Sequence, residues 1–318
     1  MSLVINTTIP EGIVLAADSR QSYRNRKGMA RIGSDNASKL FQINKRIGVA
    51  ITGLAFLPEN GVLKNISKYI EQFKHEKDTN KLSVKKAAEK LHALFSQKYN
   101  WQDQMDGLIK KIENDLSRQG LKLLDLKKDK GAVKFRFIDG EGKEKNGAAN
   151  IDPVNLLVAG YNDDASHEVC RCDIPGAIRS MRDSQKKGME YGATWMGQED
   201  VVTRIILGFD NRIGNLKFFN EAIQKHGSDE INKQLTSLQY NIQWGTMTLQ
   251  DAIDISTLMI QTTSAIQRFS DGIMADPGDM PGVGGPVDIA VIKQDKGFIW
   301  ISKKKLTVGN VEVDIDKI

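Results

Sequence analysis

Short apolar runs that occur in pairs constrain the fold of this chain more than any other feature. Three such pairs are SLVINTTI (2–9) with IVLAAD (13–18), KLFQI (39–43) with IGVAIT (47–52), and VDIAVI (287–292) with GFIWIS (297–302). Pro10, Glu11 and Gly12 supply a tight turn between the first two runs. Runs of this length joined by turn residues predict β-hairpins. The chain is therefore expected to form antiparallel sheets from strands near both of its ends.

Amphipathic segments alternate with these strands. Apolar residues follow helical spacing in 62–73 and 83–95, and Ser83 is a suitable N-cap for the second segment. Further helices are predicted at 198–208, 227–241 and 248–268, and further strands at 154–160, 167–173 and 190–195. The order β, α, β, α, β with antiparallel pairs predicts an α+β fold, a four-layer αββα sandwich of two antiparallel sheets between helical layers.

The chain is expected to form a single domain that covers 2–318. Two segments differ from the rest of it in their sequence pattern. Residues 103–149 carry 11 Lys or Arg and 9 Asp or Glu, with a predicted hairpin around Gly140–Gly142. We interpret 96–150 as a charged insertion made of a helix extension and a hairpin. Residues 210–247 are interpreted as a helical insertion.

Composition narrows the range of partners. No apolar run approaches the roughly 18 residues of a membrane helix, and the net charge of +5 comes from interleaved rather than clustered residues. We therefore expect neither a membrane nor a nucleic acid as a partner. Cys170 and Cys172 stand too close together for an unstrained disulfide, which favours a cytoplasmic location. The four histidines have no zinc-like spacing, so no metal and no cofactor is expected.

Asp18 and Lys39 are the two unexpected charges in the N-terminal strands. Period-2 alternation places Asp18 on the face of Val14 and Ala16, and Lys39 on the face of Phe41 and Ile43. An unpaired buried charge is costly, so the two residues are expected to be neighbours or to meet another charge. The alternative is that both lie at strand ends and simply reach solvent.

The first hairpin brings the N-terminus to the same place. With a turn at 10–12, residue i pairs with residue 22 − i or 23 − i, so Ser2 is expected beside residues 20 and 21. Removal of Met1 would leave Ser2 with a hydroxyl and an α-amine whose unperturbed pKa is about 7.8. Such an amine is able to act as a base for its own hydroxyl.

The chain resembles the proteasome β-type subunits of the N-terminal-nucleophile hydrolases. The resemblance is carried, in order, by GIVLAADSR (12–20), ASKLFQI (37–43), ITGLA (51–55), LSVKKAAEKLHALF (82–95), MTLQDAIDIS (247–256) and VDIAVI (287–292). It implies the N-terminal-nucleophile hydrolase fold, a peptide or unfolded protein as substrate, and a homo-oligomeric ring. An ATPase that feeds such a ring is not specified by the sequence.

Residue by residue, the resemblance places the nucleophile at Ser2, sixteen residues before Asp18, and the catalytic lysine at Lys39. The glycine whose N–H lines the oxyanion hole falls on Gly53, fourteen residues after Lys39. The resemblance also implies a mostly apolar substrate pocket, with a preference for an apolar side chain. Its walls are Gln21, Ala37, Phe41, Ile51 and Ala55.

The chain departs from the family pattern at three points. The nucleophile is serine rather than threonine, because Thr7 and Thr8 lie mid-hairpin and too close to Asp18. The accessory serine falls on Met196, and MPGVGG (280–285) replaces the late Asp-x-x-Ser pair unless Asp279 substitutes for it.

The sequence predicts an N-terminal-nucleophile peptidase that forms an acyl-enzyme. Two alternatives stay open. One is a non-proteolytic amide hydrolase or acyl transferase of the same fold, and the other is an inactive, proteasome-like structural subunit.

Overall fold

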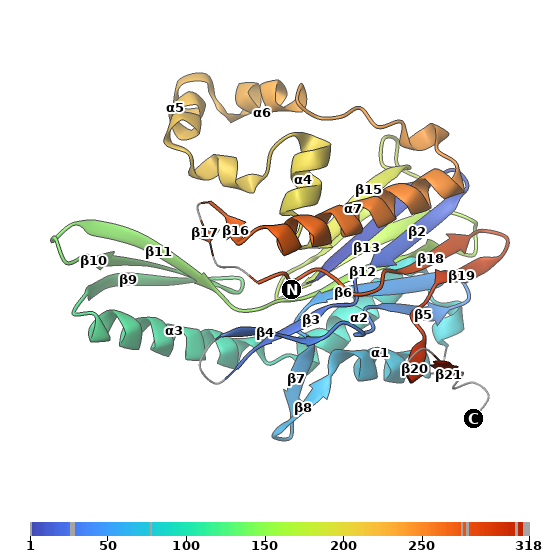
Figure 1. Cartoon of the computed structure of the whole chain (residues 1–318), viewed down its shortest axis with the longest axis horizontal. Helices are drawn as coiled ribbons and strands as arrows, with labels where there is room; N and C mark the ends of the chain where they lie inside the picture. The colour runs from blue at the N-terminus through green and yellow to red at the C-terminus, as the bar shows by residue number, and fades with distance from the viewer. Residues whose placement is uncertain are drawn as a thin grey trace.

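A computed structural model describes residues 2–25, 29–76, 78–274, 276–277, 280–308 and 311–313. The protein is a mixed α and β structure whose strands all pair in an antiparallel manner across its two five-stranded sheets. The two sheets lie at the centre of the molecule, and helices flank them on opposite sides (Figure 1). The predicted mixed composition and antiparallel sheets are confirmed. Met1 and Asp279 lie outside the described residues.

The first sheet has the order β15-β1-β2-β18-β19. Its strands are β1 (Leu3–Ile9), β2 (Gly12–Ala17), β15 (Gly192–Gly197), β18 (Asp288–Lys293) and β19 (Gly297–Ser302). Both β1 and β2 are buried along their whole length, because other elements cover both faces of this sheet. A strand covered on both faces has a nearly continuous apolar pattern, as IVLAA does. In β1 the buried polar side chains of Asn6, Thr7 and Thr8 are hydrogen-bonded.

The second sheet has the order β14-β13-β12-β6-β5. Its strands are β5 (Leu40–Asn44), β6 (Ile47–Gly53), β12 (Val154–Tyr161), β13 (His167–Ile174) and β14 (Ile178–Asp183). Four short hairpins join the body: β3 (Gln21–Arg24) with β4 (Ala30–Ser34), β7 (Phe56–Glu59) with β8 (Val62–Asn65), β16 (Gly272–Ile273) with β17 (Asp276–Pro277), and β20 (Leu306–Val308) with β21 (Val311–Val313).

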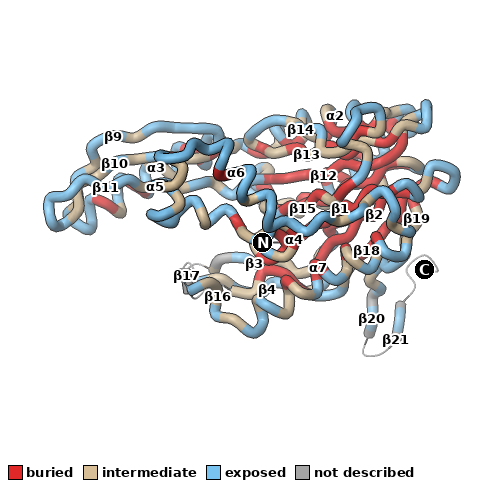
Figure 2. The backbone as a smooth tube through the Cα atoms, turned by 90° about the horizontal axis from the view of Figure 1, so that it is seen from above, coloured by how far each residue is buried: buried red, intermediate tan, exposed pale blue. Residues whose placement is uncertain are grey.

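Three apolar cores hold the body together, and the buried strands run through its middle (Figure 2). Leu15, Ala50 and Leu157 belong to the core between the two sheets. The outer face of the second sheet packs on α1 (Ile66–Lys74) and α2 (Val84–Lys98). The outer face of the first sheet packs on α4 (Asp200–Leu207) and α7 (Leu249–Phe269).

The helix ends follow from local chemistry. The Ser83 side chain accepts a hydrogen bond from the Lys86 N–H, as its predicted N-cap role requires. Thr248 and Asp251 form a reciprocal capping box at the start of α7. A suitably capped helix needs less tertiary contact to hold its first turn, so these sequence signals locate the helix starts accurately.

A separate arm projects from the body at one side (Figures 1 and 2). It consists of α3 (Trp101–Arg118) and a three-stranded sheet of β9 (Lys122–Asp129), β10 (Ala132–Ile138) and β11 (Glu144–Asn150). A small core that includes Met105, Ile112 and Val133 joins the helix to this sheet. Residues 211–236 form the short helices α5 (Lys217–His226) and α6 (Ser228–Thr236), preceded by a 3₁₀ turn at Asn211–Asn215.

Two sequence predictions need correction. The segment 62–73 is not helical throughout, since Val62–Asn65 is the strand β8 and the helix begins only at Ile66. The glycine turn at Gly61 and the capping side chain of Asn65 set these limits, and Val62 and Leu63 are consequently exposed.

The register of the first hairpin also differs from the prediction. Ile9 pairs with Gly12 and Val4 with Ala17, so residue i pairs with 21 − i. The turn is shorter than expected because Gly12 already belongs to β2. Ser2 consequently stands closer to Asp18 than the sequence indicated.

Candidate active site

A buried ion pair joins Asp18 and Lys39. Their side chains are 0 % and 7 % exposed, and Lys39 Nζ lies 2.7 Å from Asp18 Oδ1. Lys39 Nζ also donates to the carbonyl oxygen of Arg20. Burial lowers the pKa of the Lys39 ammonium, and the charge of Asp18 opposes that shift. The prediction that the two residues are neighbours is confirmed, and the alternative of two solvated charges is wrong.

The Asp18 carboxylate is saturated with hydrogen bonds. Oδ1 accepts from the Leu3 N–H at 2.9 Å as well as from Lys39. Oδ2 accepts from the backbone N–H of Arg20 at 3.1 Å and of Gly284 at 3.0 Å. Charge-assisted hydrogen bonds of this kind replace the water that a buried carboxylate loses. Asp18 therefore links Lys39, the residue after Ser2 and the loop before β18.

Backbone contacts fix the position of Ser2. Its carbonyl oxygen accepts from the Gln198 N–H at 2.7 Å, and the next residue, Leu3, is held by Asp18. Gly197 packs so closely here that an added Cβ would lie 2.0 Å from the Ser2 carbonyl oxygen. Its φ of +108° also favours glycine. Ser2 is 6 % exposed and held on both sides along the backbone.

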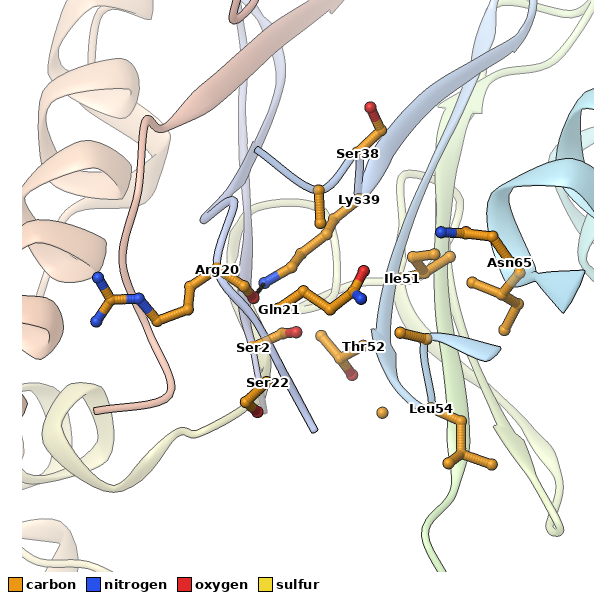
Figure 3. A pocket seen from close by; sticks show the side chains of 14 residues that line it. Ser2, Arg20, Gln21, Ser22, Ser38, Lys39, Ile51, Thr52, Leu54 and Asn65 are labelled. Atoms are coloured by element: carbon orange, nitrogen blue, oxygen red, sulfur yellow. Dashed lines mark hydrogen bonds between the residues drawn. The ribbon is translucent and has the colours of Figure 1, made fainter. Parts of the chain in front are cut away.

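Ser2 and Lys39 line one cavity, which has a volume of about 400 Å³ including its open mouth. Figure 3 shows how their side chains lie around this space together with those of Gln21, Thr52 and Asn65. Ser2 and Lys39 lie just before β1 and β5, Gln21 begins β3, and Thr52 and Asn65 lie near the C-terminal ends of β6 and β8. The cavity therefore opens where the ends of strands from both large sheets and two short hairpins meet.

Most predicted site residues reach this cavity. Its lining includes Ser2, Gln21, Ala37, Lys39, Ile51, Gly53 and Ala55. Asp18 lies behind Lys39 and does not line the cavity. Phe41 is a correction: its side chain packs in the core under α1 and α2 and is absent from the lining. Phe41 is the second residue of β5 and is turned to the outer face of its sheet.

Several lining residues were missed from the sequence. They are Arg20, Ser22, Ser38, Thr52, Leu54, Asn65 and Ile66. Thr52 Oγ1 is buried and has no hydrogen-bond partner among the described residues. Helix-cap chemistry is the one sequence signal that singles out Asn65, because asparagine before an amphipathic run is a preferred N-cap. Nothing local in the sequence indicates that this cap faces Ser2.

Gly53 occupies a position that excludes other residues. Its φ is +91°, and an added Cβ would lie 1.9 Å from the carbonyl oxygen of Pro153. The Pro153 carbonyl in turn accepts from the Leu54 N–H at 2.9 Å. A side chain at this point would both strain the backbone and displace that neighbouring strand.

A glutamine on α7 connects the segments that hold Ser2 and Asp18. Gln267 Oε1 accepts from the backbone N–H of Gly282 and of Val283, at 3.0 and 2.9 Å. Gln267 Nε2 donates to Gln198 Oε1 at 2.8 Å. Gln198 binds the Ser2 carbonyl, and Gly284, the residue after Val283, binds Asp18. The Gln267 side chain therefore holds both the segment that binds Ser2 and the segment that binds Asp18. Met196, on which the accessory serine of the resemblance falls, is buried between the sheets.

A second buried ion pair lies near the first. Lys304 Nζ binds Asp288 and lies 3.1 Å from Ser19 Oγ. Asp288 pairs with Ala17 at the start of β18, one residue away from Asp18. The positive charge of Lys304 contributes to the lowered pKa of Lys39.

Among the described residues, His, Cys, Asp and Glu side chains do not gather in groups of three or more that would hold a metal ion. Cys170 and Cys172 are free and buried, and burial raises the pKa of the Cys170 thiol to about 12. In the part of the chain that the structure describes, no helix is long and apolar enough to cross a membrane.

A scan against protein-family models finds no match, and a search of curated proteins likewise finds none.

Proposed function

We propose that this chain is an N-terminal-nucleophile amide hydrolase that acts on peptides. The observation that carries the proposal is that Ser2, Lys39 and Gly53 line one cavity, with Asp18 paired to Lys39 behind it. The layering of two antiparallel sheets between pairs of helices supports assignment to the four-layer αββα fold of this class. The proteasome β subunits, which the sequence resembles, provide the pattern for the proposal.

The reaction proceeds in two steps. The Ser2 hydroxyl attacks the substrate carbonyl carbon, and its proton passes to the α-amine of Ser2, directly or through water. Collapse of the tetrahedral intermediate breaks the C–N bond, and the proton moves to the leaving amine. Water then hydrolyses the acyl ester and regenerates the hydroxyl. Both steps require that Met1 has been removed, so that Ser2 carries the terminal amine.

Lys39 and Gly53 support this chemistry in different ways. The Lys39 ammonium supplies positive potential beside the α-amine of Ser2. This potential disfavours protonation of the amine, so that its neutral, basic form is available to accept the proton. The Gly53 N–H is proposed to donate to the oxyanion. Asp18 holds Lys39 in place through the 2.7 Å contact.

Intact mass spectrometry tests the proposal. The protein is weighed before and after incubation with a peptide epoxyketone, which reacts with a hydroxyl and a free amine on the same residue. We expect a mass without Met1 and a single stoichiometric adduct that is absent from Ser2→Ala. Ser180→Ala, which changes an exposed serine on β14, serves as the matched control and should label normally.

The opposite result has a definite meaning. Retention of Met1 without an adduct would contradict the mechanism and favour an inactive structural subunit. Hydrolysis by Ser2→Ala would exclude Ser2 as the nucleophile. The size of the native assembly then separates the remaining alternatives, because a ring would favour a peptidase and a monomer would favour small-amide chemistry.

A further inference from the structure

The cavity beside Ser2 is richer in hydrogen-bond donors than an apolar pocket would be. Its polar lining consists of Ser2, Arg20, Gln21, Ser22, Ser38, Lys39, Thr52 and Asn65. None of its described lining residues is acidic, whereas two of them, Arg20 and Lys39, are cations. The acids that balance these cations, Asp35 and Asp18, lie outside the lining. Because each cation is paired, the cavity offers mainly neutral hydrogen-bond donors to whatever enters it.

Asn65 is the donor whose orientation the fold fixes. Its Oδ1 accepts from the Ser67 N–H at 2.9 Å and caps α1. Rotation of the amide by half a turn would set the Nδ2 group against that N–H, so the cap determines which atom faces away. In Figure 3 the Asn65 nitrogen points toward the cavity. Within the described residues, Nδ2 has no hydrogen-bond acceptor of its own.

Two further polar groups share this situation. The Gln21 amide lines the cavity and has no hydrogen bond to another described side chain or backbone group. Thr52 Oγ1 is buried and finds no hydrogen-bond partner in the part of the chain that the structure describes. Binding of an apolar group costs free energy here, because it displaces the water that these donors bind and leaves them unpaired. An occupant that brings a hydrogen-bond acceptor avoids that cost.

We propose that Asn65 selects substrates whose side chain, on the acyl side of the cleaved bond, carries a carbonyl or carboxylate oxygen. Glutamine, asparagine, glutamate and aspartate share this chemistry, and leucine and methionine lack it. This inference rests on the proposed hydrolase function and names its substrate class. It differs from the apolar preference that the sequence resemblance implied, because Asn65 and Thr52 were not among the predicted pocket walls.

The test uses four peptide substrates that differ only in the residue whose carbonyl is attacked: glutamine, glutamate, methionine and leucine. Methionine matches glutamine in length and lacks the oxygen. The wild-type protein is expected to cleave the glutamine or glutamate peptide with a kcat/KM at least about tenfold above that of the methionine peptide. Comparison of glutamine with glutamate separates an amide substrate from an acidic one.

Asn65→Asp is the informative variant, because a carboxylate oxygen still caps α1 but offers no donor to the cavity. The ratio between the preferred peptide and the methionine peptide is expected to fall to within about threefold. Asn65→Ala removes the cap as well. It should show the same loss of preference with a lower thermal unfolding midpoint, so preference and stability are measured apart.

The outcomes separate this inference from the proposed function. Wild-type cleavage that favours methionine or leucine would overturn the inference and leave the hydrolase intact. So would an unchanged ratio in Asn65→Asp. Failure of the wild-type protein to cleave any of the four peptides, together with the absence of an epoxyketone adduct, would overturn both. An adduct with no glutamine or glutamate cleavage would count against the inference alone.

Discussion

Substitution of Lys39 by methionine tests whether the buried pair with Asp18 is a structural as well as a chemical element. Methionine keeps most of the length of the side chain and removes the charge. Breaking a buried ion pair at one partner typically costs about 3–5 kcal/mol, because the other charge stays buried. In Lys39→Met, Asp18 retains its three backbone donors from Leu3, Arg20 and Gly284. We therefore expect a loss at the lower end, about 3 kcal/mol.

Asp18→Asn is expected to destabilise the protein more than Lys39→Met. Asp18 accepts four hydrogen bonds, two of them on Oδ2 from the N–H groups of Arg20 and Gly284. In Asp18→Asn the amide must turn its Nδ2 group toward the donors on one side, where it cannot accept their hydrogen bonds. The substitution also leaves the Lys39 ammonium without an anionic partner. Each of these effects leaves a buried group unsatisfied.

Urea unfolding at pH 7, followed by tryptophan fluorescence at a fixed protein concentration, measures both variants. Lys86→Met is the matched control. Lys86 lies 2.7 Å from Glu89 in an exposed pair whose side chains are 66 % and 38 % accessible. Its loss should change the unfolding free energy by less than about 0.5 kcal/mol. A cost below about 1 kcal/mol for Lys39→Met, or a larger cost for Lys39→Met than for Asp18→Asn, would refute the reasoning.

Three further predictions follow from single positions. Gly53→Ala should lower the free energy of unfolding by at least about 2 kcal/mol and abolish acylation, because φ is +91° and the Cβ meets Pro153; a normal thermal midpoint would contradict this. Gln267→Met should lower kcat about tenfold with little change in KM, since it loosens the supports of the nucleophile rather than the cavity; a change confined to KM would exclude this positioning role. Because burial raises the pKa of Cys170 to about 12, neither cysteine should react with a thiol reagent at pH 8 until urea is added; fast labelling of the folded protein would show that these thiols are accessible.

The elements that could be predicted from the sequence are those with local signals. The hairpin β1–β2 follows from two apolar runs around a turn, and α2 and α7 follow from Ser83 and Thr248 as caps with periodic apolar residues behind them. The strand β14 escaped prediction, and α5 was predicted only as part of the helical insertion 210–247, without bounds of its own. Three of the six residues of β14 are charged and only Asp183 is buried, and no residue of α5 is buried, so neither element has the strongly buried face that gives a clear sequence signal.

The Asp18–Lys39 ion pair shows a case in which strand alternation in the sequence does not predict where the side chains lie. Strict alternation assigns Asp18 to the face of Val14 and Ala16, and Lys39 to the face of Phe41. These are the outer faces of two different sheets, which lie on opposite sides of the inter-sheet core. The two charges nevertheless meet, because Asp18 follows the last residue of β2 and Lys39 precedes the first residue of β5. Outside the regular strands, the backbone is free to turn both side chains inward.

The sequence alone determined the type of the strands and helices that carry a clear local signal, the hairpin pairing of neighbouring strands such as β1 and β2, and the cost that requires Asp18 and Lys39 to find partners. These properties depend on the spacing of residues close together in the chain. Only the tertiary structure decided that Gln198 binds Ser2, that Gly284 binds Asp18 and that Asn65 lines the same cavity as Ser2, since each comes from a different segment far along the chain. Contacts between distant segments depend on how two sheets and their helices pack, and that packing is the sum of many weak interactions that no local motif encodes.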